Sequence, residues 1–246
     1  MGKNFELLQQ VDREIAYTGS GAVATVVAPA KGNGLHRNVV NGDEIARLVQ
    51  RVFRTPDSLV PRVVVFSGVE AGGGCTSICA ATAETLAAVA PGTFCVVDAD
   101  LRNPSLHQHF GLENRVGLAD AIVQPGPIQS FAQRVAGTNL WVLPAGSAKA
   151  GINALLSSDA LQARLTELRS EFTQVLIDSS PLNRCADAIV LGRISDGLLL
   201  VLQSDATRRE AARSVTENLK NSNVLLLGAV LNRRTFPIPQ NLYNRL

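Results

Sequence analysis

Lysine, aromatic residues and long apolar runs are scarce in this chain of 246 residues. Only four of its 23 basic residues are lysines, at positions 3, 31, 149 and 220, and aromatic residues make up 4% of the sequence. With so few aromatic rings, the core has to be built from Val, Leu, Ile and Ala, a composition that suits parallel strands covered by helices on both faces. No apolar run approaches the roughly 18 residues that a membrane span requires, which argues against direct membrane insertion.

Charge and cysteine spacing exclude further classes of protein. The net charge is +2 at pH 7, far from the strongly basic surface of a dedicated nucleic-acid binder, so no nucleic-acid partner is expected. The four cysteines contain no C-x-x-C pair and the chain has three histidines, which gives a structural zinc site little support. The first residues lack the apolar segment of an export signal. We therefore expect a cytoplasmic protein with reduced thiols.

The pattern of apolar residues divides the chain into three regions. Residues 1–60 contain two amphipathic helices, at 5–15 and 43–53, joined by a Gly/Ala/Val-rich stretch that we interpret as a flexible arm. Residues 61–236 alternate short apolar runs with longer amphipathic stretches, and residues 237–246 form a short tail. We expect residues 61–236 to form one large α/β domain.

Residues 61–236 predict a doubly wound α/β sheet. Each short run is almost wholly apolar, as expected of strands covered on both faces. Strands and helices alternate along the chain, which predicts a three-layer, mostly parallel sheet with helices on both faces. The predicted strands lie at 63–66, 94–97, 140–143, 175–177, 198–202 and 224–231, and the predicted helices at 76–90, 117–123, 128–134, 159–172, 185–194 and 207–221.

A glycine-rich loop follows the first of these strands and leads into a helix. Glycines let several backbone N–H groups point at one anion, and the dipole of the following helix favours negative charge. A phosphate-binding loop has lysine before its Ser or Thr, where this chain has cysteine. The loop therefore predicts a phosphate site that has lost its cation, with a glycine-rich turn that binds nothing as the alternative. Its candidate ligand-binding residues are Gly72, Gly73, Gly74, Cys75, Thr76 and Ser77.

Aspartates end two of the predicted strands. Asp98 ends the second strand, Asp100 follows with one residue between them, and Asp178 ends the fourth. The carboxyl ends of parallel strands form the ligand-binding edge of an open sheet, and a hydrated Mg²⁺ needs few protein carboxylates. The sequence therefore predicts a magnesium site at this edge. An aspartate that only caps a helix is the alternative for any one of them.

Together these segments resemble the bacterial tyrosine kinases of capsule and exopolysaccharide synthesis, which are relatives of the septum-site and partition ATPases. The likeness covers most of residues 62–233 and implies a sheet of the P-loop NTPase type. It rests on the loop at 68–77, on DADLRNP at 98–104 and VLIDSSP at 175–181, which are similar to Walker-type motifs, and on shorter segments at 117–120, 143–146, 186–188 and 228–232.

The resemblance implies roles for individual residues and a partner. Thr76, Asp98 and Asp178 would lie near the Mg²⁺ of a bound ATP or ADP, and Asp100 would serve the attacking hydroxyl, so the three aspartates are the candidate catalytic residues. Arg102 is a further candidate nucleotide contact. The implied partner is the cytoplasmic tail of a membrane polysaccharide chain-length or export protein, which would recruit the chain to the inner face of the plasma membrane. Self-association is also implied.

Departures from the family pattern predict impaired chemistry. Cys75 replaces the phosphate-contacting lysine, and the tyrosine-rich tail is reduced to Tyr243. The Glu-x-x-Arg-x-x-Arg assembly signature at 44–50 ends in Gln50, and the Asn-Pro segment is only partly matched at 153–156. A lost charged donor costs about 1.5–3 kcal/mol, or roughly ten- to hundredfold in affinity. Where the donor acts on transition-state charge, its loss costs about 10²–10³ in rate.

The sequence therefore favours a degenerate family member that acts as a regulator or scaffold in exopolysaccharide synthesis or export, with weak or absent nucleotide binding. The alternative is an active ATP-dependent autokinase or ATPase, in which Arg62 or Arg102 replaces the lysine and Tyr243 is the acceptor. A partition-type ATPase receives little support, because a membrane-targeting tail helix and a basic DNA-binding face are not recognised in the sequence.

Three further features are left open by the sequence. A thiol at a helix N-terminus can have a lowered pKa, so Cys75 is either a redox-sensitive thiolate or a small residue that replaced a lysine no longer needed. His107 and His109 have a spacing that permits a shared metal, although such spacing recurs by chance. The arginine cluster at 208–213 includes Arg208, which follows Thr207 as in the family's Thr-Arg pair, and it fits either an anionic partner or a solvated helix face.

Overall fold

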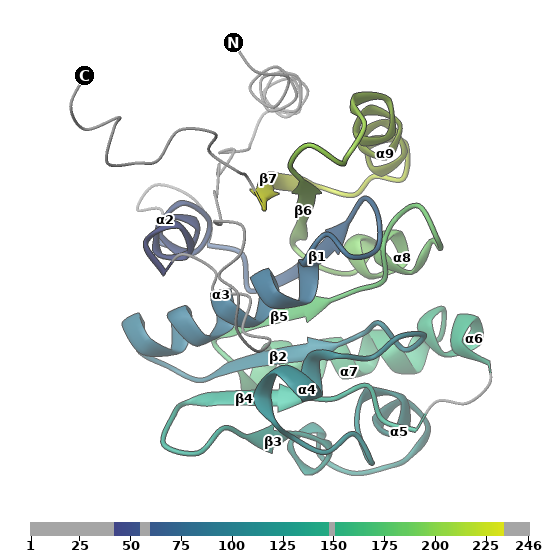
Figure 1. The fold of residues 1–246 in the computed structure, drawn as a ribbon. Helices are drawn as coiled ribbons and strands as arrows, with labels where there is room; N and C mark the ends of the chain where they lie inside the picture. The colour runs from purple at the N-terminus through teal and green to yellow at the C-terminus, as the bar shows by residue number, and fades with distance from the viewer. Residues whose placement is uncertain (1–41, 55–59, 148–150, 234–246) are drawn as a thin grey trace.

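The computed structural model describes residues 42–54, 60–147 and 151–233, which are drawn in colour in Figure 1. The predicted helix at 5–15, the arm that follows it and Tyr243 lie outside these residues, and the boundaries of the three regions stay predictions. The helix expected at 43–53 is present as α2 (Gly42–Phe53).

Seven strands form one sheet in the order β3-β4-β2-β5-β1-β6-β7. All neighbouring strands are parallel except β3 and β4, which are antiparallel. The doubly wound, mostly parallel sheet is therefore confirmed, together with the six predicted strands. The strands are β1 (Val63–Gly68), β2 (Phe94–Asp98), β3 (Gln133–Arg134), β4 (Leu140–Leu143), β5 (Gln174–Asp178), β6 (Gly197–Gln203) and β7 (Leu226–Asn232).

The segment at 128–134 is not the helix that the sequence predicted. A single 3₁₀ turn, η1 (Ile128–Phe131), is followed by the short strand β3, which pairs with β4. Ala132 already has extended backbone angles, and the Arg134 side chain donates to the carbonyl of Thr138 at 2.9 Å, across the turn into β4. Pairing with the edge of the sheet thus overrides a weak helical pattern.

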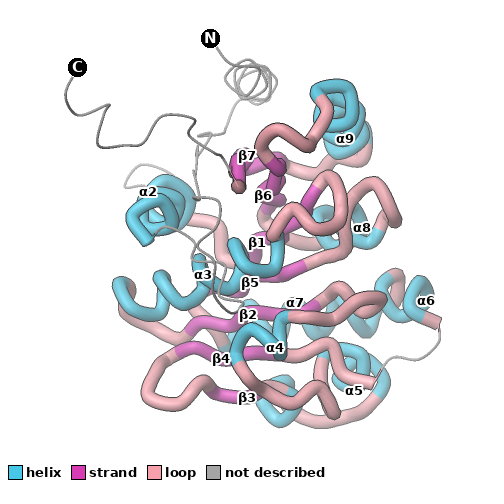
Figure 2. Tube along the Cα trace, in the orientation of Figure 1, coloured by secondary structure: helices cyan, strands magenta, loops and turns pink. Residues whose placement is uncertain are grey.

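Helices follow most of the strands and lie on both sides of the sheet, so that the magenta strands of Figure 2 run between cyan helices. The one-turn helices α4 and α6 were not predicted. The helices after α2 are α3 (Cys75–Val89), α4 (Leu106–Phe110), α5 (Leu118–Val123), α6 (Ile152–Leu156), α7 (Asp159–Glu171), α8 (Asp187–Arg193) and α9 (Arg209–Asn221).

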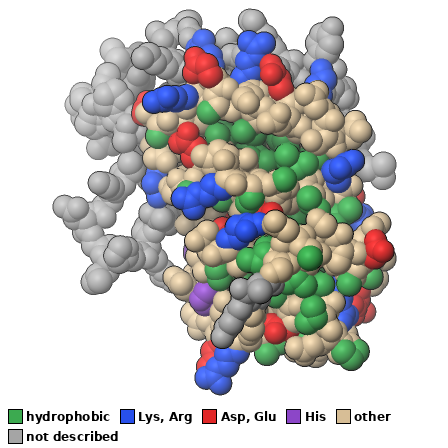
Figure 3. Space-filling model, turned by 90° about the vertical axis from the view of Figure 1, so that its right-hand side faces the viewer, with side chains coloured by type: hydrophobic (Ala, Val, Ile, Leu, Met, Phe, Trp, Pro, Cys, Tyr) green, Lys and Arg blue, Asp and Glu red, His purple; other side chains and the backbone are tan. Residues whose placement is uncertain are grey.

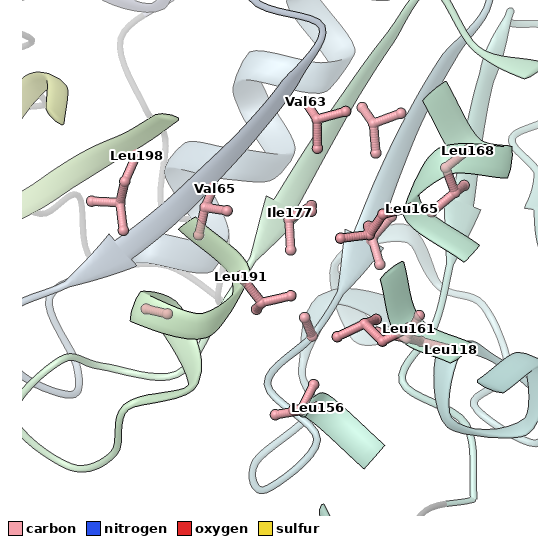
Figure 4. Packing of buried hydrophobic residues seen from close by; sticks show 14 of the residues in the cluster. Val63, Val65, Leu118, Leu156, Leu161, Leu165, Leu168, Ile177, Leu191 and Leu198 are labelled. Atoms are coloured by element: carbon pink, nitrogen blue, oxygen red, sulfur yellow. The ribbon is translucent and has the colours of Figure 1, made fainter. Parts of the chain in front are cut away.

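Alternation along β1 explains why its sequence is wholly apolar. Val64 and Phe66 pack in one buried cluster with residues of α2, α3 and α4, whereas Val63 and Val65 pack in a second cluster with residues of α5, α7, α8 and α9. Figure 4 shows part of the second cluster, where Val65 lies near Leu191 of α8. Because both faces are covered by helices, neither set of side chains is free to be polar.

The helix α2 belongs to the first of these clusters. Its residues Ile45, Leu48 and Val49 are almost fully buried, and they pack with Ile78 of α3. Glu44 and Arg47, which lie in the partial assembly signature, form an ion pair of 3.5 Å in which the arginine side chain is 70% exposed. The apolar side of α2 is therefore committed to the core, while Arg47 stays accessible.

A network around Asp196 fastens the amino end of β1. The backbone N–H groups of Arg62 and Val63 donate to its Oδ2 at 2.7 and 2.8 Å, and Arg169 of α7 donates to its Oδ1 at 2.6 Å. Partial burial opposes ionisation of the carboxyl group, but the hydrogen bonds from Arg169, Val63 and Arg62 outweigh it and lower the pKa of Asp196. Asp196 thus joins β1 to α7 and to the segment that follows α8.

Replacement of Asp196 by asparagine is expected to destabilise the fold by about 1 kcal/mol, a value reduced for the solvent exposure of the network. Because the pKa of Asp196 is lowered on folding, its contribution is complete above the unfolded pKa of about 4 and is lost as pH falls below it. Chemical denaturation at pH 7 and pH 3 should therefore show a larger difference between wild type and Asp196→Asn at pH 7. Equal differences at both pH values would show that the lowered pKa of Asp196 is not the source of the stability. Glu217→Gln is the matched control, because Glu217 forms an exposed pair with Arg213.

Candidate functional site

The loop between β1 and α3 has the backbone shape that its glycines predict. Gly72 and Gly74 have φ angles of 80° and 84°, a left-handed region that glycine enters without steric cost. Gly74 is the N-cap of α3, and a Cβ atom on it would collide with Nδ2 of Asn232. Glycine at position 74 is therefore required by a neighbour from another strand as well as by the backbone angle.

Asn232, at the end of β7, holds this loop in place. Its Nδ2 donates to the carbonyl of Gly73 at 2.8 Å, and its Oδ1 accepts the N–H of Arg233, also at 2.8 Å. The asparagine is only 5% exposed. The sequence marked the segment at 228–232 as similar to the family but gave Asn232 no role, because its contact with the loop spans 159 positions.

Asp98 and Asp178 lie side by side, since they are paired in register at the ends of β2 and β5. Asp98 is fully buried, and its Oδ2 accepts the N–H groups of Ser105 and Leu106 at 3.1 and 3.0 Å. It therefore fastens the start of α4, so the helix-capping alternative holds for this residue in part. Burial raises the pKa of Asp98 to about 7, with Asp100 adding to the rise and the backbone N–H groups opposing it.

Asp178 is the most poorly satisfied carboxylate of the site. It is 1% exposed, and its Oδ1 has no hydrogen-bond partner. Burial and the nearby Asp98 raise its pKa to about 8, although the side chains of Thr76 and Cys75 partly offset this. A buried carboxylate oxygen without a partner is costly. The orphaned oxygen is therefore the strongest indication in the described residues that this edge takes a cationic ligand.

Cys75 lies at the start of α3, half-buried beside this carboxylate pair. Burial, followed by the repulsion of Asp178 and Cys79, raises the pKa of its thiol well above the usual value. The raised pKa disfavours a thiolate at this position, because burial and the neighbouring acidic groups outweigh the helix N-terminus. At the position where a phosphate loop has a cation, this chain has a neutral side chain.

Neither of the arginines considered as substitutes reaches the loop. The guanidinium of Arg62 donates to the carbonyls of Arg169 and Phe172 at 2.6 and 3.0 Å, beyond the amino end of β1. Arg102 follows β2, and its side chain donates to Asp187 at 3.0 Å and to Asn153. Both guanidinium groups are thus committed to other partners.

Arg102 instead lines a cavity of about 440 Å³ beside the loop that contains Asp100. The cavity also contains Asn153 of α6, Arg184 and Cys185 of the segment after β5, and Asp187 of α8. Asp100 accepts the hydroxyl of Ser180 at 2.7 Å through its Oδ1. Figure 3 looks onto the right-hand side of Figure 1, where basic side chains lie beside hydrophobic ones across the middle of the surface.

The remaining predicted residues take less specific positions. Ser77 follows Thr76 in the first turn of α3 and is half-buried. His107 and His109 belong to no cluster of three or more metal-ligating side chains among the described residues. Arg208 is exposed at the N-cap of α9, and Arg213 pairs with Glu217 at 2.9 Å. Of the helices that the structure describes, none has the length and apolar character of a membrane span.

The residues that surround the loop fit a magnesium-bound phosphate group. Thr76, Asp98 and Asp178 offer one hydroxyl and two carboxylates, and a Mg²⁺ that also binds phosphate needs only one or two protein carboxylates. The loop has the left-handed glycines that an anion cradle requires, and the buried Oδ1 of Asp178 has no hydrogen-bond partner. When bound, Mg²⁺ would neutralise charge on the phosphates.

Comparisons with known sequences identify relatives of two kinds. The profile of the family described as "Cellulose biosynthesis protein BcsQ" matches residues 62–228. Tyrosine-protein kinase YwqD of Bacillus subtilis (strain 168) is 30% identical over 211 residues, with 82% of this chain and 88% of that protein covered. The succinoglycan biosynthesis transport protein ExoP of Rhizobium meliloti (strain 1021) is 29% identical over 175 residues, which cover 70% of this chain but only 22% of ExoP.

Solved structures share the fold. The chimerical protein CapA2B2 has a TM-score of 0.79 at 21% identity, with 93% of this chain and 100% of that chain covered. The Pyrococcus furiosus cell division ATPase MinD has a TM-score of 0.60 at 24% identity, with 70% of this chain and 72% of that chain covered. The described domain therefore has the three-layer α/β fold of the P-loop NTPases. With the profile match over more than half of its length and the identity to YwqD, this chain belongs to the P-loop family of the bacterial tyrosine-protein kinases and the cellulose biosynthesis protein BcsQ.

Proposed function

We propose that this chain is a degenerate tyrosine-kinase-like P-loop protein, which binds magnesium and nucleotide weakly and acts as a regulator or scaffold in exopolysaccharide biosynthesis or export. The observation that carries the proposal is the neutral Cys75 thiol at the start of α3, beside two buried carboxylates with raised pKa values. The phosphate cradle is kept, but the loop has no cation at the position that acts on the transferred phosphate.

Loss of the lysine is expected to affect nucleotide binding less than phosphoryl transfer. Loss of one charged donor weakens binding by roughly ten- to hundredfold, an effect that backbone N–H groups and Mg²⁺ partly offset. The same loss lowers the rate by about 10²–10³ when the donor stabilises charge that develops in the transition state. At the ends of β2 and β5, Asp98 and Asp178 would still hold the metal together with Thr76. Weak binding is therefore retained more easily than phosphoryl transfer.

A membrane polysaccharide chain-length or export protein is the proposed partner, through its cytoplasmic tail. Support comes from the relatives, which include the cellulose biosynthesis protein family BcsQ and a succinoglycan biosynthesis transport protein. The match covers about a fifth of ExoP, and the proposed contact with such a protein lies at the inner face of the membrane. Self-association through α2 belongs to the same proposal, since Arg47 is accessible there.

An active autokinase with Tyr243 as acceptor is the weaker alternative. It requires another cation in place of the lysine, and the two arginines that the sequence suggests for that role are held by other partners. Arg62 is bound at the opposite edge of the sheet, and Arg102 is bound to Asp187 and Asn153.

Restoring the lysine is expected to tighten nucleotide binding. Titration calorimetry with Mg-ADP should give a dissociation constant about ten- to hundredfold lower for Cys75→Lys than for wild type, because the new ammonium lies against the phosphates and beside Asp178. The control Gln124→Lys adds the same charge at an exposed position away from the loop and should leave affinity unchanged. Tight binding by the wild type that Cys75→Lys does not improve would show that residue 75 is not decisive.

The carboxylate pair is expected to make the unliganded protein less stable as pH rises. Burial first, together with carboxylate repulsion, raises the pKa values of Asp98 and Asp178 to about 7 and about 8, above the unfolded value of about 4. The folded state then holds more protons than the unfolded state, so the free energy of unfolding falls between about pH 4 and pH 8. Thermal unfolding of wild type at pH 5.5 and pH 8.5 should show this fall, and Asp178→Asn should show a smaller one.

Asp159→Asn is the matched control for the pH experiment, because Asp159 is in the first turn of α7, away from the pair. This variant should keep the pH dependence of the wild type. If Asp178→Asn loses as much stability between the two pH values as the wild type does, Asp178 does not retain its proton in the folded state.

A further inference from the structure

One cationic side chain near the glycine loop comes from a part of the chain that the nucleotide motifs do not include. Arg233 directly follows β7, and its Nε lies 4.0 Å from the position that a Cβ atom would take on Gly74. No carboxylate among the described residues pairs with its guanidinium, in contrast to Arg102 with Asp187. The side chain is exposed and is thus available to a ligand in the loop.

Strand order explains how Arg233 reaches this place. β6 lies between β1 and β7, and Asn232 pairs with Gln203 at the carboxyl ends of β7 and β6. Asn232 then extends its amide to the carbonyl of Gly73, which brings the end of β7 against the loop that follows β1. The next residue, Arg233, is therefore fixed beside Gly74 by a buried hydrogen bond.

The backbone of Arg233 is itself unusual. Its φ angle is +59°, a left-handed conformation that disfavours residues with a Cβ atom. The N–H of Arg233 donates to Oδ1 of Asn232 at 2.8 Å, so the same asparagine that clamps the loop also holds this turn. Glycine would meet the backbone requirement more readily, yet the position has a long cationic side chain.

We infer that Arg233 supplies the positive charge for phosphate groups bound in the glycine loop, in place of the lysine that Cys75 replaces. The inference rests on the proposed nucleotide binding and names the residue that sustains it. The ligand class is the di- or triphosphate of a nucleotide with Mg²⁺. Independent support for a ligand comes from Asp178, whose buried Oδ1 has no partner.

The proposed site then has acidic side chains on one side of the loop and a basic side chain on the other. Asp98 and Asp178 approach from β2 and β5 on one side of the loop, and Arg233 approaches from β7, on the other side of β1 in the strand order. A guanidinium donates two parallel hydrogen bonds to a phosphate, but its rigid fork, arriving from outside the loop, does not act as the flexible point charge of a lysine. Arg233 therefore suits binding of phosphate better than its transfer.

The test measures binding of Mg-ADP and of inorganic triphosphate by calorimetry in wild type, Arg233→Gln and the control Arg193→Gln. Arg193 is exposed in the last turn of α8, so its replacement removes the same charge away from the loop. Arg233→Gln should weaken binding of both ligands about tenfold or more, Arg233→Lys should restore part of it, and Arg193→Gln should change neither. In a Cys75→Lys background, Arg233→Gln should cost less than about threefold, because lysine then supplies the charge.

Other outcomes separate the inference from the proposed function. Equal affinity of wild type and Arg233→Gln overturns the inference and leaves weak nucleotide binding intact. An equal loss in both backgrounds also overturns it, as does a drop in the thermal unfolding midpoint of Arg233→Gln, which would make the residue structural. If neither the wild type nor Cys75→Lys binds Mg-ADP, the proposed nucleotide site itself fails.

Discussion

Two carboxylates buried side by side at the ends of β2 and β5 constrain the whole carboxyl edge of this sheet. Asp98 and Asp178 are in register, and no basic side chain in the described ranges forms an ion pair with either. Burial raises their pKa values to about 7 and about 8. Burial and mutual repulsion make such a pair unfavourable for the fold when both carboxylates are charged. The arrangement becomes favourable when a ligand brings positive charge, and that requirement links the sheet order, the glycine loop and the proposed use of magnesium.

The replacement of a lysine by Cys75 changes what this edge can do rather than how it is built. The loop keeps its left-handed glycines and its clamp from Asn232, so the anion cradle survives. Burial, followed by repulsion from Asp178, raises the pKa of the thiol and favours its protonated form. In the proposed site, positive charge for the phosphates would come from the metal and from a side chain outside the loop. Under the proposed function, the chain would bind nucleotide and dock on a partner without efficient phosphoryl transfer.

Local sequence patterns predicted most of the strands and helices, and they predicted the glycine loop and the aspartates of the site but not its contacts from β7. The apolar strands, the glycine loop and the strand-end aspartates were predicted because each depends on residues close together in the chain, and parallel order then brings Asp98 and Asp178 together. Asn232 and Arg233 were missed because their contacts with the loop join residues far apart in sequence. The hydrogen-bond partners of Arg62 and Arg102 could not be predicted for the same reason. The segment that contains β3 was predicted as a helix, because its pairing with β4 decides its structure.

The most direct test of this account follows Mg-ATP by phosphorus-31 NMR after it is mixed with an equimolar amount of the wild-type protein. The account predicts that the phosphate signals shift or broaden on binding while ATP persists for hours, and that Cys75→Lys consumes it measurably faster. Conversion of ATP to ADP by the wild type within minutes, abolished by Asp98→Ala, would contradict the claim that a neutral side chain at position 75 has disabled the chemistry.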